Sequence, residues 1–255
     1  MTGIRNAITA LVAAALLMAG SAFAAANVQS LRGDVRAGNV QLAVKDRVTS
    51  GATITTGIGA QAVLRFDDGQ QVVINENTVF RIVDFRYRPE EPGNDRAIFD
   101  LVRGALRVIS GAVVARNWGN FQLRIPQATI GIRGTDFMVA LVNPAYTNVL
   151  HGAISVSNSG GNTVFGAGSF GSVASANALA VSIPSSALPA AASSAFSSMG
   201  AVAGVTAGGM AAGAPPALSA GGVTTAGVGA AAAVGLGIAA GIGLMNDNSS
   251  STTHH

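Results

Sequence analysis

The chain has 255 residues, of which 11% are charged and 5% are aromatic, and it contains no cysteine. The lack of cysteine excludes disulfide bonds and thiolate metal sites. The sequence pI is about 10.2, but the net charge is only +3 and basic residues are interleaved with acidic ones. Because no run of lysine or arginine is present, we expect no nucleic-acid partner.

Residues 1–24 have the three zones of a secretory signal. Arg5 supplies the positive start, residues 8–18 are apolar, and an Ala-Phe-Ala cleavage pattern ends at Ala24. The apolar stretch is shorter than the ~20 residues that a membrane-spanning helix needs. We therefore expect a cleaved signal peptide, cut after Ala24 or, as an alternative, after Ala26, and a protein exported to the periplasm or outer envelope of a Gram-negative bacterium.

The charged part of the chain follows, and it shows the period-two alternation of β-strands without any helical period. Strands are expected at residues 61–66, 70–74, 79–88, 97–102, 105–109, 121–125, 137–142 and 153–157. Asp67-Asp68-Gly69 predicts the hairpin turn between the first two, and residues 89–94, with two prolines, predict a loop. No helix is expected before Pro184. Several short strands at this spacing predict an all-β sandwich, roll or solenoid.

Three segments share one pattern of aliphatic, polar, glycine, any residue, aliphatic, polar. They are residues 31–37, 102–108 and 150–156. A glycine inside a strand-like run indicates a bulge or a sharp bend. We therefore expect the chain to bend at equivalent points of each segment, as a solenoid or a rolled sheet requires.

The most specific segment is residues 125–139, where an X-Pro kink and an apolar run lead to an arginine flanked by glycines. Gly134 permits a tight turn there. Across such a turn Arg133 and Asp136 are close enough to pair, and the Thr135 side chain can bond the exposed backbone.

This segment resembles the end of the domain that defines the FecR family of bacterial envelope proteins. The family pattern is glycine, aliphatic, arginine, glycine, threonine, acid, phenylalanine, and the residues here that match it and form the expected signature turn are Gly131, Arg133, Gly134, Thr135, Asp136 and Phe137. Three earlier segments also resemble parts of the family pattern, and the short hairpin and strand that end the family domain are expected here as well. These are residues 51–57, 66–69, 77–78 and 147–156.

The resemblance covers roughly residues 33–173. It implies an extracytoplasmic, solenoid-like or roll-like β domain, taken as residues 27–173, that binds other proteins without a cofactor. In the regulators that name the family, this domain passes a signal to an inner-membrane anti-sigma segment. The chain begins instead with a signal peptide, so direct control of a sigma factor is not expected.

An uncharged tail follows the β domain, since no formally charged residue occurs from 137 to 246. Residues 174–222, rich in alanine, serine, glycine and proline, predict mostly a linker, with a local helix around 190–198. Residues 223–245 are long enough to span a bilayer, and small residues four apart would let such helices associate; the alternative is a low-complexity tract. Residues 246–255 form a polar end.

Catalytic and metal chemistry is not expected from these residues. His151 is the one histidine inside the β region and predicts a surface position, because no serine or carboxylate partner is placed beside it. Neighbouring Asp67 and Asp68 should point to opposite faces of a strand. Trp118 is either an exposed recognition residue or, as we favour, a cap on the core.

Three functions remain open from the sequence. The first is a non-catalytic envelope protein whose β domain binds a protein partner in sensing, signalling or assembly. The second is a surface-associated structural protein whose glycine- and alanine-rich tail inserts in a membrane or self-assembles. The third is a secreted enzyme or polysaccharide-binding module, although no small-molecule substrate is evident.

Overall fold

The structure is a computed structural model that describes residues 24–202 and Val205. The expected signal peptide up to residue 23, the expected apolar segment 223–245 and the polar end 246–255 lie outside the described residues. Within the described part, no helix is both long enough and apolar enough to cross a membrane.

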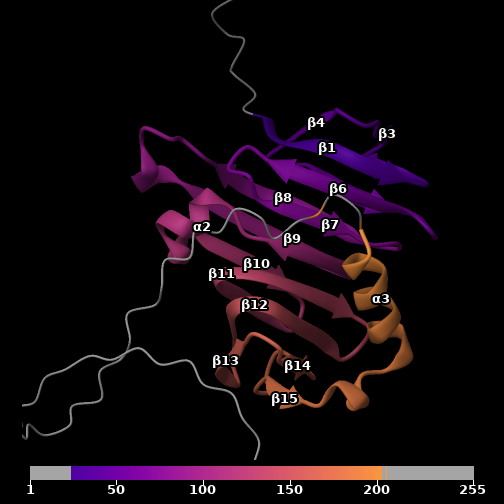
Figure 1. The fold of residues 1–255 in the computed structure, drawn as a ribbon, viewed down its shortest axis with the longest axis vertical. Helices are drawn as coiled ribbons and strands as arrows, with labels where there is room; N and C mark the ends of the chain where they lie inside the picture. The colour runs from indigo at the N-terminus through magenta and orange to yellow at the C-terminus, as the bar shows by residue number, and fades with distance from the viewer. Residues whose placement is uncertain (1–23, 203–204, 206–255) are drawn as a thin grey trace, which may run out of the picture. The chain divides into compact units, whose positions relative to one another are not determined.

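Strands make up most of the fold (Figure 1). In chain order they are β1 (Ala24–Arg32), β2 (Val35–Ala37), β3 (Val40–Gln41), β4 (Arg47–Thr49), β5 (Thr53–Thr56), β6 (Gln61–Phe66), β7 (Gln71–Ile74), β8 (Val79–Arg86), β9 (Arg96–Ile109), β10 (Phe121–Ile125), β11 (Ala128–Leu141), β12 (Ala145–Asn158), β13 (Gly161–Gly166), β14 (Phe170–Val173) and β15 (Val181–Ile183). The helical elements are η1 (Pro92–Asn94), α2 (Ala112–Arg116), η2 (Trp118–Asn120), η3 (Ser185–Ala187) and α3 (Ala190–Gly200). The short helix α2 and the turns η1 and η2 were not expected.

The strands form one continuous sheet that rolls into two layers, because three long strands change partners half-way along their length. Layer A has the order β4-β1-β6-β7-β9-β11-β12-β14-β15, and layer B has the order β3-β2-β5-β8-β9-β10-β11-β12-β13. β9, for example, pairs with β8 and β10 through its first half and with β7 and β11 through its second half. The all-β expectation is confirmed, and the fold is a rolled open sheet.

Glycines stand where the chain passes from one layer to the other. Gly33 between β1 and β2, Gly104 in β9 and Gly152 in β12 have φ of +73°, +87° and +72°. A side chain at Gly104 would overlap Thr78, and one at Gly152 would overlap the carbonyl group of Gly134. The bends predicted from the repeated pattern are therefore confirmed at all three positions.

The expected strands 97–102 and 105–109 are one bent strand, β9. In the same way, the expected hairpin over 147–156 is wrong, because these residues run through the single strand β12. A glycine with positive φ redirects the strand while the hydrogen-bond ladder continues on both sides. For this reason, a mid-strand glycine is easily read as a strand end.

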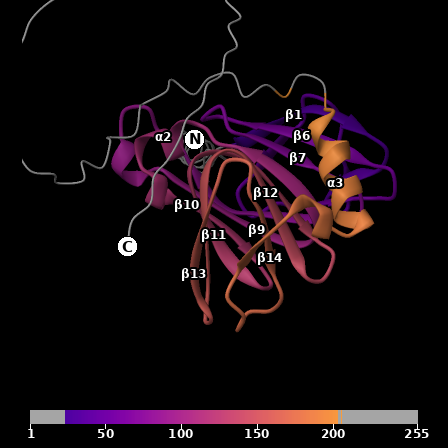
Figure 2. The same cartoon turned by 60° about the horizontal axis from the view of Figure 1, so that its bottom comes forward.

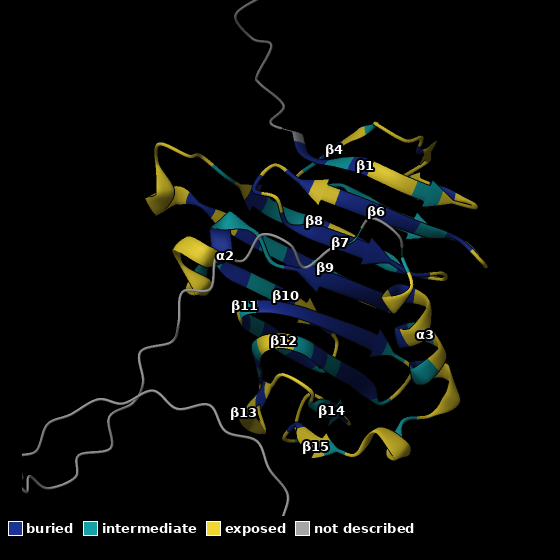
Figure 3. Ribbon diagram, in the orientation of Figure 1, coloured by how far each residue is buried: buried dark blue, intermediate teal, exposed yellow. Residues whose placement is uncertain are grey.

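The main core fills the space between the two layers, and the central strands are mostly buried (Figure 3). Phe99 lies within it, with its ring centroid 5.2 Å from that of Phe66 and 5.4 Å from that of Phe80. The inward residues of both layers alternate with outward ones, so layer B presents a solvent-facing surface of its own.

A second, smaller core lies on the outer side of layer A, where α3 covers the sheet. Ala192, Phe196 and Met199 of α3 pack against apolar residues that include Val73 and Met138. The helices α2 and α3 lie at opposite sides of the domain in both views (Figure 2).

The linker expected over 174–222 is thus wrong where β15 forms and where the chain docks on the sheet. The local helix expected around 190–198 is confirmed, because α3 occupies Ala190–Gly200. Small residues dominate this segment, but one phenylalanine and one methionine on the same helix face supply enough apolar area to dock it. The remaining linker residues, 203–222, lie outside the described part except for Val205.

Candidate functional site

The acidic residue of the signature, Asp136, is 1% exposed and forms an ion pair with Arg107 of the neighbouring strand β9. The guanidinium donates from Nε to Oδ1 at 2.8 Å and from Nη2 to Oδ2 at 2.6 Å. Its Nη1 also donates to the carbonyl oxygen of Met199, in the last turn of α3, at 3.3 Å. The Arg107 guanidinium, held by the signature carboxylate, therefore ties β9 and β11 of layer A to the helix that covers them.

The expected pair between Arg133 and Asp136 is wrong. The strand β11 has a register shift between these two residues, with Gly134 at φ +54°. Arg133 belongs to the half of β11 in layer B, opposite Ala153, whereas Asp136 belongs to the half in layer A. The Arg133 side chain therefore belongs to layer B and the Asp136 side chain to layer A, so they do not meet. A tight turn was expected at Gly134, but this residue makes a bend within one continuous strand.

Arg133 lies instead over the ring of Trp118, with its guanidinium carbon 4.5 Å from the ring centroid. Trp118 is 56% exposed, so the favoured interpretation of it as a cap on the core is wrong. Its position is set by η2, where Asn117 Oδ1 accepts a hydrogen bond from the backbone N–H of Gly119 at 3.0 Å. Trp118 and Arg133 together form an exposed cation–π pair.

The other signature residues have structural positions. Phe137 is fully buried in the main core, and a side chain on Gly131 would come within 2.8 Å of Ser155 Oγ. The Thr135 backbone exchanges hydrogen bonds with Ser110, because its N–H donates to Ser110 Oγ at 3.0 Å and its carbonyl accepts from Ser110 N at 2.9 Å. The Thr135 hydroxyl is buried without a partner among the described residues, which corrects the expectation that it bonds exposed backbone.

Asp68 is a buried carboxyl group whose structural contacts were not predicted from the sequence. Its Oδ1 accepts from the Gln70 N–H at 2.9 Å, and its Oδ2 accepts from the Val113 N–H, at the start of α2, at 3.2 Å. Burial raises the pKa of Asp68 above its usual value, and nearby Asp95 adds to the increase. The carboxyl group therefore joins the β6–β7 turn to α2, while Asp67 pairs with exposed Arg47.

Positive charge is concentrated on the outer surface of layer B. Outward positions of its central strands hold six arginines, which we call the arginine face: Arg81, Arg86, Arg96, Arg103, Arg124 and Arg133. Only two carboxylates, Asp84 and Asp100, lie at outward positions of the same strands. The resulting surplus of four positive charges exceeds the net charge of +3 of the whole chain.

His151 is exposed on β12, as expected of a surface residue. Within residues 24–202, no group of three or more histidine or carboxylate side chains is placed to hold a metal ion. Four carboxyl or guanidinium groups of the described residues are buried: Asp68, Asp95, Arg107 and Asp136. Asp95 pairs with Arg116 at 3.0 Å, and the other three are engaged in the structural contacts described above.

The FecR protein family matches residues 52–155 of the chain. These residues are a FecR domain. The matched range contains the whole signature and two of the three bending glycines, Gly104 and Gly152. A search among curated proteins gave no match.

Two crystal structures, at 2.50 and 1.65 Å resolution, of a protein from Parabacteroides distasonis ATCC 8503 provisionally described as an anti-sigma factor are similar to the chain. Their sequence identities are 18% and 17%, with TM-scores of 0.42 and 0.41. Each alignment covers 51% of this chain and 58% of the other. The chain thus spans little more than half of those structures.

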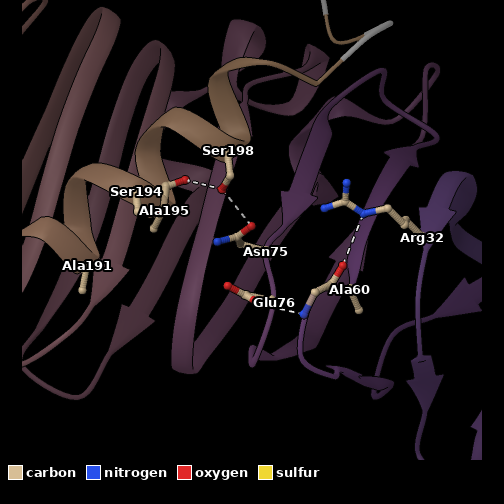
Figure 4. A pocket seen from close by; sticks show the side chains of 9 residues that line it. Arg32, Ala60, Asn75, Glu76, Ala191, Ser194, Ala195 and Ser198 are labelled. Carbon is tan, nitrogen blue, oxygen red and sulfur yellow. Dashed lines mark hydrogen bonds between the residues drawn. The ribbon is translucent and has the colours of Figure 1, made fainter.

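A shallow pocket of about 290 Å³ lies between α3 and the turn before β6, next to the FecR domain's β7 (Figure 4). Its polar groups bond one another: Glu76 Oε2 accepts from the Gly59 N–H at 2.6 Å, and Ser198 Oγ donates to Asn75 Oδ1 at 3.0 Å. Because these groups are already engaged, the pocket marks the line along which α3 docks on the sheet.

Proposed function

We propose that this chain is an exported, non-catalytic cell-envelope protein whose FecR domain binds another protein in envelope sensing, signalling or assembly. The match of residues 52–155 to the FecR family carries the proposal, because the resemblance to that family implies an extracytoplasmic β domain that binds other proteins. The uneven surface charge adds support, since a charged, exposed sheet face is suited to recognising a partner of opposite charge.

Export rests on the signal at residues 1–24, and we propose that it is cut after Ala24. Cleavage there keeps Ala25 and Ala26, which are 1% and 0% exposed, within the mature chain. Cleavage after Ala26 would remove both residues and the pairing of Ala26 with Phe66 of β6. Amino-terminal sequencing of the exported protein tests this, and a sequence starting at residue 27 would contradict it.

The decisive experiment for the function is in vivo cross-linking of the tagged full-length protein, followed by identification of the protein joined to it. A second form ending after Val205 should give the same partner, because it keeps α3 and the whole described domain. A shorter form that lacks α3 is unsuitable, since it would expose Met138 and the Arg107–Asp136 pair. If neither form is joined to a defined envelope protein, the proposal is wrong.

The alternative function is that of a structural, surface-associated protein anchored by residues 223–245. The observation that favours it is the run of 23 uncharged residues, long enough to span a bilayer with some tilt. Fractionation of the two forms into periplasm, inner membrane, outer membrane and medium distinguishes the functions. Anchoring predicts that only the full-length protein stays with a membrane, and a full-length protein that is already soluble contradicts it.

A further inference from the structure

The arginine face has a surplus of four positive charges, and half of its arginines have no carboxylate partner among the described residues. Arg81 is 3.9 Å from Asp100, while Arg86 and Arg96 are 3.1 and 3.7 Å from Asp84. Within residues 24–202, Arg103, Arg124 and Arg133 have no acidic group within ion-pair distance. Arg124 Nη2 donates to the neutral Gln122 Oε1 at 3.5 Å, and Arg133 lies over the Trp118 ring. The positive charges of these three guanidinium groups are therefore not neutralised by the described residues, and they can bind anionic groups from outside the chain.

Arg124 and Arg133 lie on one strip of this face. Arg124 is opposite Thr129 of β11, four residues before Arg133 on the same strand. A strand rises about 3.3 Å per residue, so the two arginines stand about 13 Å apart along the strand. Gly131 lies between these two positions on β11. Because it has no side chain, nothing on β11 projects above the backbone of the sheet at that point.

An exposed aromatic group completes one end of the strip. Trp118 lies under the Arg133 guanidinium and is 56% exposed, and it is the chain's only tryptophan. Its remaining ring surface offers an apolar contact next to a fixed positive charge. Tryptophan and arginine are, together with tyrosine, the residue types that most often carry binding energy at protein interfaces.

We propose that this strip, formed by Trp118, Arg124 and Arg133, docks an extended acidic segment of the partner protein. Two carboxylates about four residues apart in an extended segment have the ~13 Å spacing of the two arginines. Bidentate bonds from guanidinium to carboxylate would hold them, and an apolar residue of the segment would cover Trp118. The proposal rests on the proposed function and names the surface and the partner chemistry.

The test uses Trp118 as its own reporter. The full-length protein is titrated with a short synthetic peptide that carries two glutamates four residues apart and one leucine beside them. Binding should change the Trp118 fluorescence and should weaken when NaCl is raised from about 50 mM to about 500 mM, since salt screens exposed charges. The double variant R124E/R133E should bind the peptide at least about tenfold more weakly.

Matched controls separate this surface from general charge effects. The variant R32E/R65E changes the same net charge at two exposed arginines of β1 and β6, in layer A, and should bind like the wild type. A peptide with lysine in place of glutamate should not bind. A heparin oligosaccharide and phosphatidylglycerol vesicles test the other anionic classes, and a stronger fluorescence response to either would overturn the proposal, as would equal peptide binding by both double variants.

The cross-linked partner then tells the two proposals apart. If the same envelope protein is joined to the wild type and to R124E/R133E with equal yield, the strip is not its docking surface and the proposed function stands. If the peptide binds as expected but no envelope protein is joined to either form, the proposed function fails by itself.

Discussion

Arg107 and Asp136 face each other across β9 and β11 in a bidentate pair that is sealed by the last turn of α3. The side chain of Arg107 is 9% exposed and that of Asp136 is 1% exposed. The acidic residue of the FecR signature therefore stabilises the packing of layer A. The arginine of the same signature, Arg133, remains at the surface.

Removing one partner of this pair should be strongly destabilising. D136A leaves a buried, unpaired guanidinium, and such losses typically cost about 3–5 kcal/mol of unfolding free energy. The double variant R107M/D136A should recover part of that loss, because no charge is left buried. Urea unfolding followed by circular dichroism gives the three values. As a control, D34A breaks the exposed pair with Arg36 and should cost at most about 1 kcal/mol; an equal cost for D34A and D136A would contradict the prediction.

Gly152 should not tolerate a side chain. In G152A the residue must hold φ near +72° and its methyl group meets the Gly134 carbonyl. We expect a loss of more than about 2 kcal/mol, since left-handed backbone alone costs an L-residue about 1–2 kcal/mol. Thermal unfolding compares it with G166A, whose methyl group meets no atom within 4 Å and which should change stability by less than about 0.5 kcal/mol.

Phe196 should decide whether α3 stays docked. Removing a buried phenyl group costs about 3 kcal/mol or more, which corresponds to roughly a hundredfold greater opening of α3 if the helix leaves the sheet as a unit. Hydrogen exchange measured by mass spectrometry should show faster exchange over residues 190–200 in F196A. The exposed neighbour Ser197 provides the control, because S197A should leave that exchange unchanged. Unaltered protection in F196A would show that the apolar contact does not hold the helix.

Asp68 should make stability depend on pH. Because burial raises the pKa of Asp68, the folded protein binds its proton more tightly than the unfolded chain does. Its contribution is then fully present below the unfolded pKa of about 3.9 and is lost as the pH rises through the folded pKa. The unfolding free energy of the wild type relative to D68N should therefore fall as the pH is raised above about 4.

Urea unfolding at a series of pH values measures this difference. The matched control is D67N, which alters the neighbouring carboxyl group and keeps Asp68, so the pH-dependent loss should persist in it. A wild type that becomes more stable relative to D68N over the same interval would reverse the assigned sign.

The strands and bends were predictable because their signals are local. Alternation places Val63 and Leu64 on opposite sides of β6 without any knowledge of the partner strand. The repeated glycine pattern likewise located the bends at Gly104 and Gly152. The hairpin turn at Asp67–Gly69 follows from residues that favour turns.

The contacts of the site depend on strand neighbours that are distant in sequence, and these were not predictable. Asp136 pairs with Arg107, 29 positions away in sequence, because β11 pairs with β9. The register shift of β11 at Gly134 places Arg133 in the other layer, away from Asp136. The charge surplus of layer B was hidden for the same reason. Its arginines are interleaved with acids along the chain, but the acids Asp68, Asp95 and Asp136 point elsewhere once the strands roll.

The three long strands couple the two layers of the domain mechanically. β9, β11 and β12 each run through both layers, so neither layer can open without pulling hydrogen-bonded backbone out of the other. Residues 24–200 should consequently lose structure in a single cooperative transition, with the loosening of α3 as the one earlier event. A force applied to the arginine face at Arg133 would reach the buried pair at Asp136 through only two intervening residues of continuous strand.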